Sequence, residues 1–247
     1  MASLRDLLLP REHGIWGLLA GAALVGLPPG HDLAGLPLLG AALAGVVLRQ
    51  ACIGKGASVA RALVLVLAAA SAAGCILATI WAAGDRSWEA WLIGAGCCGV
   101  PMLVPIPGRP WWGSALVALP TGLLAGAIAI AGGAPLATAG LAAIALAMHQ
   151  ISIVPLVRAQ TRGGPLWSAL AIDLHILALL IAIGLWASGW VGSGIPLVFA
   201  LGLARTAWLV DKRTPMSISP MRIGATEMAW LLVLATGIHY GLRDGAC

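Results

Sequence analysis

The sequence has 247 residues, of which 60% are hydrophobic and only 9% are charged, and its mean hydropathy is +0.98. A soluble domain carries about 25% charged residues, because its surface must face water. This composition excludes a soluble enzyme, a disordered linker and a nucleic-acid-binding domain. It predicts an integral membrane protein. In such a protein an excess of basic residues, here a formal net charge of +5, is evidence first of membrane topology and only then of a charged partner.

Apolar stretches recur along the whole chain. A transmembrane helix needs about 20 mostly apolar residues to cross a hydrocarbon core of about 30 Å. By this criterion the sequence predicts an all-α, polytopic transmembrane helix bundle of about nine spans in a single domain, residues 1–247. Residues 1–10 contain too few apolar side chains for a cleavable signal, so the first span must act as the insertion signal. The predicted spans are 15–27, 33–48, 62–83, 90–106, 114–131, 136–157, 168–188, 194–210 and 223–240.

The basic residues test this count independently. Nine spans place twelve Lys and Arg residues on the side of the N-terminus, and only Arg86 and Arg243 on the other side. Because cytoplasmic loops are enriched in Lys and Arg, we expect a protein of the inner (plasma) membrane with a cytoplasmic N-terminus and an external C-terminus. The twelve are Arg5, Arg11, Arg49, Lys55, Arg61, Arg109, Arg158, Arg162, Arg205, Lys212, Arg213 and Arg222.

Ionisable side chains inside the predicted spans are the candidate functional groups, because each is costly in hydrocarbon. His149, Asp173, His175 and Glu227 lie within about 12 Å of the cytoplasmic ends of their spans at about 1.5 Å per residue. Asp173 and His175 are two residues apart and therefore point to different faces of one helix. His239 is placed near the external surface and is left out of the site.

Residues at the cytoplasmic rim complete a predicted pocket that opens to the cytoplasm. Such groups could titrate, bind a metal or hold a charged headgroup, or they could pair as interhelical contacts, and the sequence does not choose between these roles. It assigns no metal site and leaves any cofactor unknown, although His149 and His175 could in principle ligate a haem. The candidate ligand-binding residues are Arg11, Glu12, His13, Trp16, His149, Arg158, Arg162, Asp173, His175, Arg222 and Glu227.

Four short segments carry a family resemblance. Residues 10–16 match a Pro-x-x-His-Gly-x-Trp pattern, residues 154–163 form a basic stretch, residues 167–175 contain Trp-Ser and a downstream His, and residues 222–227 read Arg-Ile-Gly-Ala-Thr-Glu. With these motifs in this order the chain resembles the YwiC-like family of integral membrane proteins. The resemblance implies a multi-pass membrane protein and leaves its biochemical role open.

The predicted layout is also similar, more distantly, to the UbiA superfamily of intramembrane prenyltransferases. That likeness implies nine spans, a cytoplasmic N-terminus and functional loops after spans two and six. Its members hold a magnesium diphosphate with Asp-rich motifs in those loops, whereas residues 48–55 and 155–162 contain no carboxylate. Because Mg²⁺ requires oxygen ligands, the resemblance does not extend to that metal site.

Three functions fit these observations. The first is a membrane protein that binds or transports a small anionic or amphipathic ligand in a cytoplasm-facing cavity, without being a magnesium-dependent prenyltransferase. The second is a UbiA-like transferase that acts on a lipid or haem substrate without the Asp-rich clamp. The third is an assembly factor for a membrane complex. The expected partners are the lipid bilayer and a small-molecule or lipid ligand; no nucleic acid is expected, and the oligomeric state stays open.

Overall fold

The structure, a computed structural model, describes residues 13–29, 32–53, 59–86, 89, 111–211 and 220–244. Within these ranges all regular structure is helical, and no strand is present. The elements are α2 (His13–Gly26), α3 (Leu36–Ile53), α4 (Val59–Ala83), the short 3-10 helix η1 (Gly84–Arg86), α6 (Trp111–Ala131), α7 (Leu136–Arg162), α8 (Pro165–Ala187), α9 (Gly194–Asp211) and α10 (Pro220–Asp244).

Each of the eight α-helices overlaps one predicted span, which confirms the all-α prediction for the described residues. The fourth predicted span, 90–106, lies outside them. The two largest boundary errors, five residues each, are at the end of α3 and at the basic stretch expected to follow the sixth span. Residues 158–162 are instead the last turns of α7, and the helix ends where Gly163 adopts a φ of 67°. Basic side chains favour this position, because the C-terminus of a helix carries a partial negative charge.

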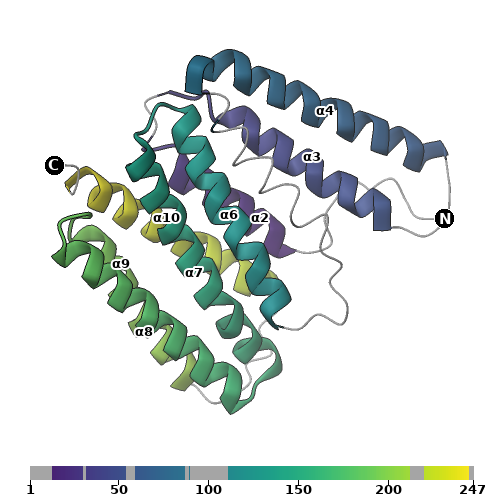
Figure 1. Cartoon of the computed structure of the whole chain (residues 1–247). Coiled ribbons are helices and arrows are strands. Elements are labelled where there is room, and N and C mark those ends of the chain that lie inside the picture. The colour runs from purple at the N-terminus through teal and green to yellow at the C-terminus, as the bar shows by residue number, and fades with distance from the viewer. Residues whose placement is uncertain are drawn as a thin grey trace.

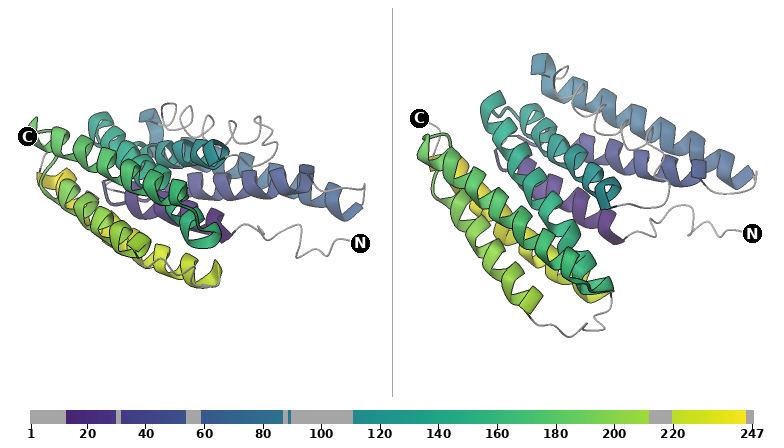
Figure 2. Two further views of the ribbon diagram at one scale, coloured as in Figure 1. Left: turned by 90° about the horizontal axis from the view of Figure 1, so that it is seen from below. Right: turned by 60° about the horizontal axis from the view of Figure 1, so that its bottom comes forward.

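The helices form two groups, visible in Figure 1 and in both views of Figure 2. α3 and α4 pair with each other at one side of the molecule, while α7 lies at the centre of the other group. α7 packs against α2, α6, α8, α9 and α10, so its side chains are buried on several faces. From α6 to α10 successive helices alternate in direction, and α4 and α6 run in the same direction (Figure 1).

Small residues allow the helix backbones to approach closely. A Cβ atom at Gly122 would lie 2.5 Å from the carbonyl oxygen of Ala143 in α7, and one at Gly241 would lie 2.8 Å from the backbone nitrogen of Ile195 in α9. The core between the helices is rich in alanine, including Ala125, Ala139 and Ala182. The small-residue pairs 122/126 and 237/241 therefore form packing faces between helices.

Three helical segments are long and apolar enough to cross a membrane: Ala62–Ala83, Leu136–Thr161 and Pro165–Ala187. Shorter apolar helices occupy Leu36–Leu48, Leu119–Ala131 and Gly194–Val210. The outer faces of α4 and α8 expose large apolar side chains such as Leu67, Leu77, Leu177 and Leu180. Exposed apolar faces of this extent suit contact with lipid, and the segments indicate association with a membrane.

Candidate functional site

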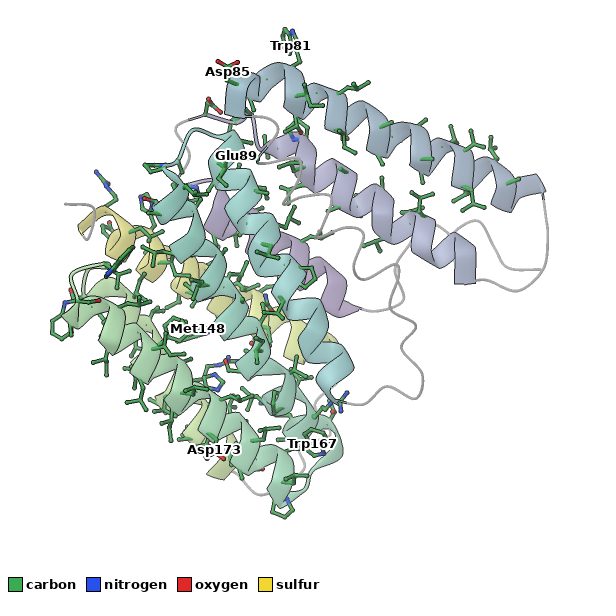
Figure 3. All side chains as sticks on the ribbon, viewed as in Figure 1. Trp81, Asp85, Glu89, Met148, Trp167 and Asp173 are labelled. Carbon is green, nitrogen blue, oxygen red and sulfur yellow. The ribbon has the colours of Figure 1, made fainter. Side chains whose placement is uncertain are left out.

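Polar side chains from four helices gather around the middle of α7. Figure 3 labels Met148, the neighbour of His149, in this central region of the bundle. We call this set the polar cluster. It consists of His149, Gln150 and Ser152 on α7, His175 on α8, Arg205 and Thr206 on α9, and Glu227 on α10.

His175 is the most fully bonded member of the polar cluster. Its Nδ1 lies 2.8 Å from the carbonyl oxygen of Ala171, one turn earlier in α8, so Nδ1 carries the hydrogen and donates it. In the neutral ring Nε2 is then the acceptor, and the Thr206 hydroxyl donates to it at 3.1 Å. The Ser152 hydroxyl lies 3.5 Å from Nε2 but donates at 2.9 Å to the carbonyl oxygen of His149. These bonds fix the tautomer and the orientation of the ring.

Glu227 and Arg205 form an ion pair between α10 and α9. Nη1 of Arg205 donates to Oε2 of Glu227 at 3.2 Å, and Nη2 donates to Oε1, so the contact is bidentate. The guanidinium also lies over the ring of Trp230, 5.4 Å from its centre. Both charged side chains are about one-sixth exposed. Arg205 has five N–H donors, and Glu227 takes two of them.

His149 and Gln150 are buried without a side-chain hydrogen bond to any described residue. Only 4% of His149 and 6% of Gln150 is exposed. His149 interacts electrostatically with His175 and Arg205, whereas Gln150 faces α2, where its Nε2 lies 3.2 Å from the position of a Cβ at Gly21. Buried polar groups normally have partners, so two adjacent exceptions on the central helix require an explanation.

Of the predicted site residues, the structure brings together His149, His175 and Glu227. Asp173 does not join them, because its side chain is exposed on the opposite face of α8 from the buried His175. Figure 3 shows Asp173 nearer the α7–α8 turn, where Trp167 lies. Arg158 is placed at that turn, with its guanidinium 4.9 Å from the centre of the Trp167 ring.

For the other predicted site residues, either the whole residue or its side chain lies outside what the structure describes. Arg11 and Glu12 lie outside the described residues. For four more the helix is described but not the side chain: His13 and Trp16 in α2, Arg162 in α7 and Arg222 in α10. The predicted cytoplasmic rim therefore stays a prediction, and the polar cluster rests on other residues.

Sequence reasoning missed Arg205, which it assigned to a cytoplasmic loop. Arg205 lies within α9, one helical turn and a half before Asp211, and pairs across to α10. A signal was present, because Arg205 falls inside the apolar stretch 194–210 and a buried cation needs a partner. Ser152 and Thr206 gave no comparable signal, since hydroxyl side chains are common in transmembrane helices.

The described residues contain no group of three or more His, Cys, Asp or Glu side chains placed to hold a metal ion. No protein-family model, curated protein or solved structure matches the chain. The resemblance to the YwiC-like family and to the UbiA superfamily therefore stays a prediction from the sequence motifs.

Proposed function

We propose that this chain is a multi-pass protein of the inner membrane that binds or moves a small anionic or amphipathic ligand at the polar cluster. The observation that carries the proposal is Arg205, a cation held inside the helix bundle by Glu227, with three N–H donors that bond no described residue. Intramembrane charges are retained where they serve a ligand or an ion path. Arginine suits carboxylate and other oxyanions, because its planar fork donates two parallel hydrogen bonds.

Nine crossings with a cytoplasmic N-terminus form part of the proposal. The alternation of α6 to α10 supports an odd number of crossings from α6 onward. Because α4 and α6 run in the same direction, a chain that crosses at every helix must cross once more between them. This topology places the α7–α8 turn, with Arg158 beside Trp167, at the cytoplasmic surface. Ligand would then enter from the cytoplasmic side.

Binding to the full chain in lipid nanodiscs tests the proposal. The probes are acetate, inorganic phosphate, nitrate and octanesulfonate, which cover small and amphipathic anions. We expect at least one to bind above the level of empty nanodiscs, and Arg205→Lys to weaken that binding at least tenfold, because lysine keeps the charge but loses the fork. His239→Gln is the matched control, since His239 lies on α10 outside the polar cluster.

Two results would contradict the proposed function. One is the absence of binding by all four anions. The other is equal affinity in the wild type, Arg205→Lys and Arg205→Gln. The proposed transferase and assembly functions have their own signatures: turnover of a prenyl diphosphate by the purified protein, and a stoichiometric partner that copurifies with it.

A further inference from the structure

The formal charges of the polar cluster cancel before any ligand arrives. Arg205 contributes one positive charge and Glu227 one negative charge, in a bidentate pair. The groups that face His149 are His175 from α8, Arg205 from α9 and, paired with Arg205, Glu227 from α10. α6 contains no ionisable residue, and the described side chains of α2, residues 19–26, are apolar or glycine.

A monovalent anion bound here would leave one uncompensated negative charge. An unpaired charge in a buried site is costly by several kcal/mol, so a compensating proton is favoured. The groups able to take that proton without breaking the Arg205–Glu227 pair are the two imidazoles. At His175 both nitrogens are already engaged, since Nδ1 donates to Ala171 and Nε2 accepts from Thr206. Protonation there would force the Thr206 hydroxyl to turn away.

His149 has no such obstacle. The residue is only 4% exposed, and neither ring nitrogen bonds to a described residue. A protonated ring would have two N–H donors. Ser152 donates to the backbone carbonyl of His149 and lies 3.5 Å from Nε2 of His175, which accepts from Thr206, the neighbour of Arg205 in α9, so His149 and Arg205 belong to one polar cluster. Without an anion that pair of cations would repel, whereas with an anion between them both would be compensated. Proton and anion therefore stabilise each other at this position.

We propose that His149 takes up one proton for each monovalent oxyanion of a strong acid bound beside Arg205, so that proton and anion binding are coupled. The inference rests on the proposed function and adds to it the ligand class and the coupled ion. No covalent bond changes: the proton comes from water, stays on a ring nitrogen of His149, and leaves when the anion leaves. The probes below distinguish a small free oxyanion from one carried on a lipid-like molecule.

The experiment measures protons and anions together on the full chain in nanodiscs. Isothermal titration calorimetry with nitrate and with octanesulfonate is carried out in buffers that differ in ionisation enthalpy, which counts the protons exchanged per anion. Both probes stay ionised at every pH used, so a proton taken up must reside on the protein. We expect about one proton per anion, and an apparent Kd that rises about tenfold per pH unit where His149 is neutral in the free protein.

Variants assign the proton to a residue. His149→Gln keeps a hydrogen-bonding side chain but cannot hold a positive charge. We expect proton uptake to fall from about one to zero and affinity to fall at least tenfold, while His239→Gln behaves like the wild type. A wild-type count of zero overturns the coupling even where His149→Gln fails to fold.

The outcomes separate this inference from the proposed function. Nitrate or octanesulfonate binding without proton uptake, or with uptake that survives in His149→Gln, overturns the coupling and leaves anion binding intact. Binding of phosphate or acetate alone also overturns the coupling to a monovalent strong-acid oxyanion. Binding of none of the four anions overturns both. Tighter binding of nitrate identifies a small ligand, and tighter binding of octanesulfonate identifies an amphipathic one.

Discussion

Arg205 of α9 binds both carboxylate oxygens of Glu227 in α10, 22 residues further along the chain. The pair joins two helices whose connecting segment lies outside the described residues. Both carboxylate oxygens of Glu227 are thereby occupied by the guanidinium of Arg205. The sequence leaves both pairing and a ligand role open for Glu227, and the structure shows that it pairs with Arg205.

Removing one partner of this pair should cost more stability than removing both. Arg205→Gln leaves a partly buried carboxylate unpaired, and the loss of a hydrogen bond to a charged group costs about 1.5–3 kcal/mol. Arg205→Gln with Glu227→Gln leaves no net charge, so the double variant should recover part of that loss. The measurement is the free energy of unfolding in mixed micelles by a denaturant titration. Equal losses in the single and double variants would show that the pair is not coupled.

Glycines at helix contacts should respond to alanine according to the space around them. A Cβ at Gly122 would meet the backbone oxygen of Ala143 at 2.5 Å, so Gly122→Ala should destabilise the protein by about 1–3 kcal/mol. Gly140 and Gly184 have nothing within 4 Å, and alanine there should be neutral or stabilise by up to about 1 kcal/mol. Thermal unfolding followed by circular dichroism distinguishes them. A neutral Gly122→Ala would mean that α6 and α7 are more loosely packed than described.

The helices could be predicted because the thickness of the hydrocarbon core fixes the length of a spanning helix and its apolar composition is visible in the sequence. Boundaries were less accurate where a charged segment continued the helix, as at residues 158–162. Depth along a span placed His149, His175 and Glu227 at a common level, but depth does not give the direction in which a side chain points. The two-residue spacing of Asp173 and His175 does predict different faces of α8, which the structure confirms, but the shared depth alone put both among the candidate site residues.

Partners within the polar cluster could not be read from sequence at all. Thr206 meets His175 because α8 and α9 pack side by side, with Gly202 of α9 near the His175 and Trp230 rings. A Cβ at Gly202 would lie 3.7 Å from Cδ2 of His175 and 3.5 Å from the Trp230 ring. Such complementarity arises from packing rather than from periodicity.

The Thr206 hydroxyl should be required for the orientation of His175. Thr206→Val keeps the shape but removes the donor to Nε2, which leaves a buried acceptor unsatisfied at a cost of about 1–3 kcal/mol. Thr206→Ser should lose less, because the hydroxyl is retained. Thr236→Val is the matched control, since Thr236 is exposed and bonds only the Leu232 carbonyl of its own helix. Unfolding midpoints that are the same for Thr206→Val and Thr236→Val would show that the hydrogen bond from Thr206 does not hold His175 in place.

The two turns that flank α8 should face opposite sides of the membrane. We expect the turn at Gly163–Gly164 to be cytoplasmic, because Arg158 lies one turn before it, and the turn at Gly189 to be external. α8 spans Pro165–Ala187, long enough to cross a hydrocarbon core of about 30 Å at about 1.5 Å per residue. Fusions truncated after Gly163 should give a fluorescent cytoplasmic reporter, and those after Gly189 an active periplasmic phosphatase. Reporters that place both turns in one compartment would show that α8 does not cross the membrane. The orientation on which ligand entry from the cytoplasm depends would then be wrong as well.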